Sequence, residues 1–154
     1  MDFDASQSRV RQTRAWSFAR LVSIVTVAML VSPVWADESL YQRLGGEKGV
    51  QTLVHQLIQR SATDPQTKRS FVKINRPRLE KLLQQQICQL AGGGCKYEGD
   101  SMKQSHTGLD ITEAEFFGMV EHLRQVCDQQ GIDQRSKNEL LALLAPMKKD
   151  VVSP

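Results

Sequence analysis

The chain has 154 residues, of which 40% are hydrophobic and 24% are charged. This is the composition of one ordinary globular domain, and it excludes a disordered or collagen-like chain. Ten glycines, five prolines and three cysteines also exclude a small scaffold held together by many disulfides. Residues 37–154 carry 16 basic and 15 acidic side chains, so charge gives no reason to expect nucleic-acid binding.

The first 36 residues have the layout of a secretory signal peptide. A basic stretch from Arg9 to Arg20 precedes a short apolar run that ends at Ala36, before an acidic pair. The alternative is an uncleaved anchor, but this run is shorter than the roughly 20 residues that a membrane-spanning helix needs. We therefore expect a signal peptide over residues 1–36 and one domain over residues 37–154. The mature protein is then periplasmic or secreted, with no stable membrane insertion after cleavage.

The rest of the chain shows helical periodicity and no convincing strand, so the predicted fold class is all-α. A short helix over residues 39–44 precedes a helix from about residue 47 to residue 61, whose apolar residues are spaced three and four apart. Asn75 has the side chain of a good N-cap, and it opens a third helix that ends at the glycines of residues 92–94.

The second half of the chain continues in the same way. A looser segment contains a short helix near residues 102–106. Thr112 and Glu115 have the spacing of a capping box and open a long helix. The last helix is capped by Asp133 or by Ser136.

Three cysteines allow at most one disulfide within the chain. Cys88 and Cys95 flank a glycine run and would close a short loop in an oxidising compartment. The alternative, which we favour for Cys88 and Cys127, is a buried free thiol. Their spacing does not match a zinc site.

Three histidines are candidates for chemistry. His55 lies beside the apolar face of its helix and His122 has charged neighbours, so we expect both to be solvated. His106 differs because Met102 precedes it by four residues and therefore shares its helical face. A single histidine near a methionine is more often structural than a ligand, so spacing alone does not decide its role.

The sequence resembles the truncated haemoglobins, close to group 1. The resemblance extends from Ser39 to about Val152 and depends on the order and spacing of several short segments. These are the opening LYQRLGGEKG of residues 40–49, then Thr63-Asp64-Pro65, Phe71, Arg78-Leu79, Tyr97-Glu98-Gly99, the segment SMKQSHTGLDIT of residues 101–112, and Ala145-Pro146.

This resemblance implies a two-on-two helical sandwich around haem b, with His106 as the proximal iron ligand. In that role one ring nitrogen binds iron and the other donates to a carbonyl, for which the Met102 carbonyl is the natural acceptor. The connector phenylalanine of the family, here Phe71, packs on the porphyrin face. The remaining proximal lining is then Met102, Ile111, Phe116 and Met119.

The distal wall departs from the family pattern. The family usually has a tyrosine where Ile58 stands and commonly a glutamine where Leu79 or Leu83 stands. With Ile87 on the same wall, these positions are all aliphatic and offer no hydrogen bond to bound dioxygen. Gln86 shares the helical side of Leu79 and Leu83, so its amide reaches the ligand if the helix turns slightly. The alternative, which we favour, places Ile87 at the inner position and Gln86 at the rim. This puts the oxygen-storage and nitric-oxide-dioxygenase roles of the family in doubt.

The favoured function is an exported haem protein that binds small gases (O2, CO or NO) without catalysing a reaction. One alternative is a globin-fold interaction module without haem. Another is a haem redox enzyme that acts on NO or peroxide. The enzyme needs an electron donor, whose identity is unknown, and no flavin or nicotinamide domain is evident in the sequence.

Overall fold

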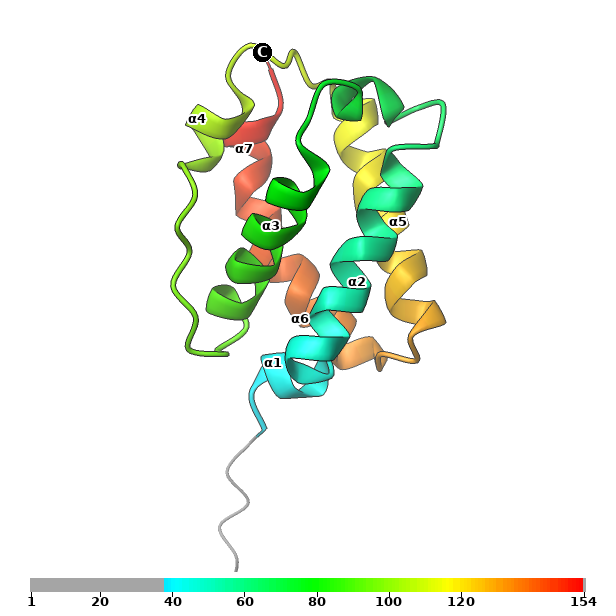
Figure 1. Cartoon of the computed structure of the whole chain (residues 1–154). Helices are drawn as coiled ribbons and strands as arrows, with labels where there is room; N and C mark the ends of the chain where they lie inside the picture. Colours follow the sequence, from blue (N-terminus) through cyan, green and yellow to red (C-terminus); the bar gives the residue numbers. More distant parts are fainter. Residues whose placement is uncertain (1–37, 154) are drawn as a thin grey trace, which may run out of the picture. The chain divides into compact units, whose positions relative to one another are not determined.

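The computed structural model describes residues 38–153, which form helices and no strand (Figure 1). The predicted signal peptide lies outside these residues. In chain order the elements are α1 (Leu40–Arg43), α2 (Gly46–Ser61), the 3-10 turn η1 (Lys68–Phe71), α3 (Arg76–Leu90), α4 (Met102–His106), α5 (Glu113–Gln129), α6 (Gln134–Leu144), the 3-10 turn η2 (Ala145–Met147) and α7 (Lys148–Val151).

Side-chain caps fix where the helices begin. The Asn75 side chain accepts a hydrogen bond from the Arg78 amide at 3.0 Å and opens α3. Thr112 and Glu115 form both bonds of the predicted capping box at the start of α5. Asp133, rather than Ser136, caps α6. The predicted positions of these helices are therefore confirmed.

A close approach between α1 and α2 explains the glycines that separate them. Gly45 has φ +88°, in the left-handed region that favours glycine. A Cβ atom on Gly49 would lie 2.0 Å from the Leu44 carbonyl oxygen. Any side chain at residue 49 would therefore push the two helices apart.

The long helices pack around one core. Helix α2 contacts both α3 and α5, and α6 contacts α1 and α5, whereas the short α4 contacts α7. The most deeply buried side chains of this core come from α2, α3, α5 and α6, and include Leu53, Val54, Ile58, Ile87, Val126 and Leu140. None of the helices in residues 38–153 is both long and apolar enough to cross a bilayer.

An irregular segment, residues 91–101, connects the end of α3 to the start of α4; we call it the strap. In Figure 1 it is the pale green chain at the left that ends at α4. The Cys88–Cys95 disulfide joins it to α3, with 5.6 Å between the two Cα atoms. The expectation of a free thiol at Cys88 is therefore wrong, because the chain reverses at Gly92 and Gly94, both with positive φ. Cys127 is a buried free thiol, as expected.

Candidate functional site

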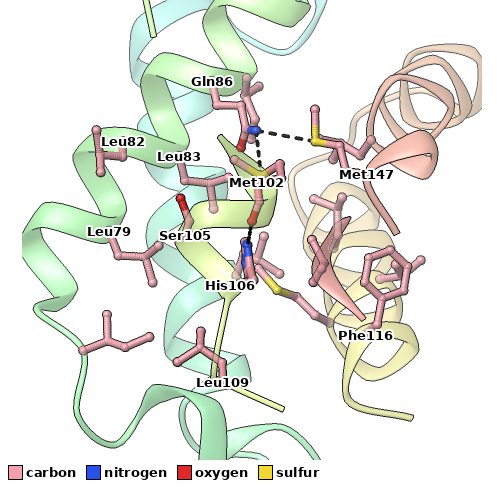
Figure 2. A pocket seen from close by; sticks show the side chains of 18 of the residues that line it. Leu79, Leu82, Leu83, Gln86, Met102, Ser105, His106, Leu109, Phe116 and Met147 are labelled. Carbon is pink, nitrogen blue, oxygen red and sulfur yellow. Dashed lines mark hydrogen bonds between the residues drawn. The ribbon is translucent and has the colours of Figure 1, made fainter. Parts of the chain in front are cut away.

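An apolar cavity of about 250 Å³ lies between α3, α4, α5 and the C-terminal helices (Figure 2). A second lobe of about 100 Å³ adjoins it near η1 and the start of α5. The two lobes are neighbours because they share part of their lining, which includes Leu79, His106, Leu109, Phe116 and Met119.

Helix α3 supplies one wall of the cavity through side chains spaced three and four residues apart. These are Leu79, Leu82, Leu83, Gln86 and Ile87. Ile87 is fully buried, but Leu79 and Leu83 keep part of their surface exposed although they are apolar. The aliphatic face of α3 is thus only partly covered by protein, and a flat apolar group in the cavity would cover the rest.

His106 lies at the end of α4 on the opposite wall. Its Nδ1 is 2.7 Å from the Met102 carbonyl oxygen, and a carbonyl only accepts, so Nδ1 must carry the proton. The capping box of Ser101 and Gln104 fixes the start of the same short helix. The ring therefore has a set orientation with Nδ1 as the donor, and Nε2 is the ring nitrogen that remains for a metal.

The ligand set also limits what kind of metal the site can hold. Residues 38–153 contain no group of three or more His, Cys, Asp or Glu side chains able to bind a metal ion together. One oriented imidazole in an apolar cavity therefore does not fit a bare ion. It fits a metal that arrives with its other ligands, as in a flat metal macrocycle.

Gln86 lies inside the cavity, so the expectation that it lies at the rim is wrong. Its side chain is only 9% exposed, and its Nε2 donates to the Sδ atoms of Met102 at 3.3 Å and Met147 at 3.5 Å. Figure 2 shows this amide where α3 meets α4 and the C-terminal helices. Thioethers are weak acceptors, and Ile87 lines the cavity beside it.

A charged network closes the second lobe, which Phe71 and Ile111 line. The Glu115 carboxylate accepts from Nε and Nη2 of Arg69, from the Ser70 hydroxyl, and from the backbone amide and hydroxyl of Thr112. These bonds, chiefly those from Arg69, lower the pKa of Glu115 to about 2. The sequence indicated the capping role of Glu115 but gave no sign of its ion pair with Arg69, 46 residues away.

Residues 39–153 match the bacterial-like globin family. The chain belongs to this family. Its relatives include a group 1 truncated hemoglobin of Mycolicibacterium paratuberculosis, 28% identical over 75% of this chain and 85% of the relative. A group 1 truncated hemoglobin of Tetrahymena pyriformis is 23% identical over 75% of this chain and 95% of the relative.

Solved structures confirm the fold of this globin. The Fe(III) form of truncated hemoglobin from Tetrahymena pyriformis superimposes with a TM-score of 0.72 at 22% identity, covering 76% of this chain and all of the other. The 2/2 hemoglobin from Synechococcus, in the cyanomet state and with covalently attached heme, gives a TM-score of 0.71 at 22% identity, covering 75% of this chain and 98% of the other. The predicted two-on-two globin fold is confirmed.

One expected wall residue of this globin lies elsewhere. Ile58 is fully buried in the core cluster and lines neither lobe, whereas Leu57 lines the main lobe. One residue along a helix is a rotation of about 100°, so the two side chains leave α2 in different directions, and only that of Leu57 reaches the cavity. Leu57, only 3% exposed and part of the same core cluster, is the residue of α2 that borders the cavity.

The two remaining histidines lie outside both lobes. His55 is solvated as expected, with 56% of its side chain exposed, and contacts Glu80. His122 is buried, so that expectation is wrong. Its Nδ1 is 3.1 Å from the Ser61 hydroxyl and its Nε2 is 3.6 Å from Asp64. Ser61 is fully buried, so no substrate can reach this serine–histidine–aspartate group, which joins α5 to the end of α2.

Proposed function

We propose that this globin binds haem b through His106 and holds a small diatomic gas in the cavity. The observation that carries the proposal is the bond from His106 Nδ1 to the Met102 carbonyl oxygen, because it orients the ring and leaves Nε2 as the nitrogen not engaged in that bond. Haem supplies an iron that binds O2, CO or NO. Membership of the globin family, whose relatives include named hemoglobins, supports the same assignment.

The cavity lining suits a flat aromatic macrocycle. Phe71 and Ile111 border the second lobe, while Met102, Phe116 and Met119 border the side on which His106 lies. Across the cavity, Leu79, Leu83 and Ile87 offer an aliphatic surface. Apolar walls exclude water and stabilise a buried porphyrin by the area that they remove from solvent.

The same walls favour ligands that need no hydrogen bond. A donor to bound dioxygen is worth roughly 1.5–3 kcal/mol, and the α3 wall supplies aliphatic side chains apart from Gln86. The Gln86 amide already donates to two thioethers at one end of the cavity. We therefore expect weak retention of dioxygen, a preference for CO, and ready oxidation of the haem.

We also propose that the protein works in the periplasm or outside the cell. The signal-peptide pattern of residues 1–36 supports export. The Cys88–Cys95 disulfide supports it independently, because disulfides persist in oxidising compartments and are rare in the cytosol.

Absorption spectroscopy tests the haem assignment. Purified protein titrated with haem should show a saturable Soret band and a five-coordinate ferrous spectrum. His106→Ala should lose this spectrum, whereas His55→Ala, which changes an exposed histidine outside the cavity, should keep it. Failure of the wild-type protein to bind haem would contradict the proposal and favour the interaction module without haem.

A further inference from the structure

We propose that the Cys88–Cys95 disulfide is a site of thiol–disulfide exchange. Reduction of this disulfide frees the strap from α3 and speeds the release of bound haem. The proposal rests on the haem-binding function proposed above. It assigns the disulfide a role in retaining haem in the cavity, beyond its contribution to folding.

The strap forms part of the cavity wall and carries the chain into the metal-binding helix. Tyr97 lines the main lobe of the cavity. Its hydroxyl donates to the Asp100 carbonyl oxygen at 2.9 Å. The next residue, Ser101, is the N-cap of α4, which ends at His106. Movement of the strap therefore changes both the wall beside the cavity and the support of α4.

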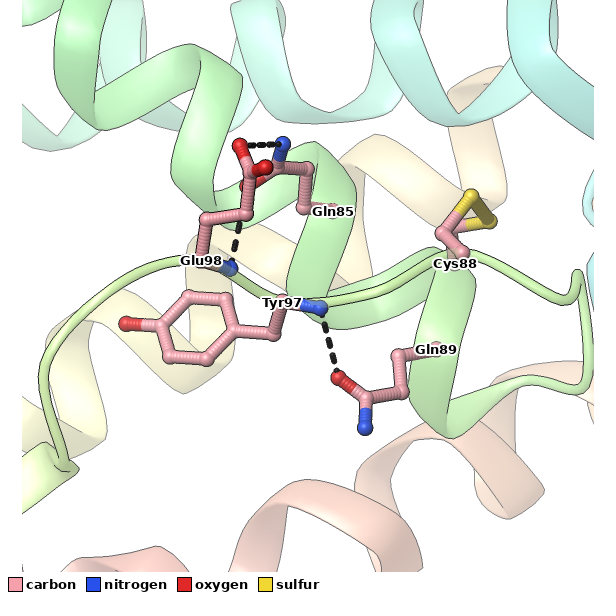
Figure 3. The surroundings of a disulfide bond; sticks show 6 residues. Gln85, Cys88, Gln89, Tyr97 and Glu98 are labelled. Carbon is pink, nitrogen blue, oxygen red and sulfur yellow. Dashed lines mark hydrogen bonds between the residues drawn. A yellow bond between two sulfur atoms is a disulfide. The ribbon is translucent and has the colours of Figure 1, made fainter.

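The disulfide joins the strap to α3 covalently (Figure 3). Non-covalent contacts accompany it: the Gly93 amide donates to the Cys88 carbonyl oxygen at 2.8 Å, and Glu98 pairs with the exposed Lys81 at 3.8 Å. The Tyr97 amide donates to the Gln89 side chain at 2.8 Å. The Glu98 amide donates to the Gln85 side chain at 3.4 Å, and the Gln85 amide donates back to the Glu98 carboxylate at 3.0 Å. These glutamine contacts are solvent-accessible and compete with water, so each is weak. The covalent bond is the strong attachment.

Cys88 and Cys95 differ in their exposure to solvent. Cys88 is 2% exposed, whereas Cys95 lies on the exposed part of the strap. A thiolate of an external dithiol therefore attacks Cys95, the S–S bond breaks, and the Cys88 sulfur leaves as a thiolate that takes up a proton. The second thiol of the reductant then resolves the mixed disulfide. The protein gains two electrons and two protons, and the dithiol becomes a disulfide.

Release of the strap is measured first, without reference to haem. Hydrogen exchange with mass spectrometry compares the disulfide form, the dithiothreitol-reduced form and the double variant Cys88→Ser/Cys95→Ser. The strap amides of Tyr97 and Glu98 should exchange at least tenfold faster in the last two. The matched control, Cys127→Ser, removes the buried thiol outside the strap and should exchange like the disulfide form. Equal exchange rates in oxidised and reduced protein would overturn the proposal.

Haem retention is measured second, by transfer of haem to excess apomyoglobin. The rate should rise at least tenfold on reduction and return to the starting value after reoxidation of the same sample. Reoxidation keeps the test valid even where the double variant folds poorly. Absence of a Soret band in every form contradicts the haem-binding function itself. A normal Soret band with equal transfer rates in oxidised and reduced protein overturns the proposed effect of the disulfide on haem release, while haem binding itself stands.

Discussion

Replacing Glu115 with glutamine tests the charged network at the edge of the cavity. Glutamine keeps the size of the side chain but removes the negative carboxylate, whose oxygens accept hydrogen bonds from Nε and Nη2 of Arg69. It also replaces one carboxylate oxygen with an amide that donates, facing groups that themselves donate. Three segments, η1, the turn before α5, and α5 itself, lose a shared anchor.

The expected cost follows from the pKa of Glu115. Its fall from 4.5 to about 2 corresponds to at most about 3.5 kcal/mol, at about 1.4 kcal/mol per pKa unit. The Arg69 side chain is 57% exposed, and the surrounding water screens the pair. We therefore expect Glu115→Gln to lower the free energy of unfolding by about 2 kcal/mol at pH 7.

The sign of the pH dependence follows from the same shift. The folded protein holds Glu115 at a lower pKa than the unfolded chain does, so the unfolded state binds the proton first as the pH falls. The stabilisation by the carboxylate is complete above about pH 5 and is lost as the pH falls toward 2. The difference between wild type and Glu115→Gln should therefore shrink over this range.

Urea unfolding at pH 7, 5 and 3 measures the effect, with all proteins in the same haem-loading state. The matched control is Glu113→Gln, which removes a carboxylate from the same helical turn, where Glu113 pairs with Lys148 at the surface. The control should cost no more than about 0.5 kcal/mol. Equal losses in the two variants at pH 7, or a Glu115→Gln loss that does not decrease toward pH 3, would refute the reasoning.

Three further predictions concern the distal wall, a helix cap and the leader. Leu83→Gln places a donor in the α3 wall and should slow dioxygen release 10- to 100-fold in stopped-flow measurements. The control, Leu83→Met, should change the release rate little. Equal release rates in wild type and Leu83→Gln would contradict an apolar distal wall without a donor. Asn75→Ala removes the cap of α3 and should lower the free energy of unfolding by about 1 kcal/mol in urea; an unchanged midpoint would contradict that role. Intact-mass analysis of exported protein should show an N-terminus at Asp37, and a mass that retains residues 1–36 would overturn the signal-peptide prediction.

The sequence predicted the helices well because their signals are local. A cap needs only a side chain and an amide two or three residues ahead, so Asn75 and Thr112 could be identified without tertiary structure. For the last helix the sequence left two candidates, Asp133 and Ser136, and the structure selects Asp133. The bond from His106 to the Met102 carbonyl is also a contact within one helical turn. Its expected geometry therefore matched the structure.

Features that depend on which helix face meets which neighbour could not be predicted in this way. His122 has charged neighbours in sequence, but the helical period places it on the same buried face of α5 as Glu115 and Val126. Whether Leu57 or Ile58 faces the cavity depends on the rotation of α2 against two other helices. The partners of the Gln86 amide, the Sδ atoms of Met102 and Met147, lie 16 and 61 residues further along the chain, so the sequence around Gln86 gives no sign of them.

In the proposed haem complex, the Nε2 atom of His106 binds the iron. Resonance Raman spectroscopy of the ferrous, ligand-free protein tests it most directly, because the iron–histidine stretch reports that bond. We expect this band in wild type and in His55→Gly, and its loss in His106→Gly. When imidazole is added to His106→Gly, an iron–imidazole band should appear. An unchanged iron–histidine band in His106→Gly would show that His106 is not the iron ligand.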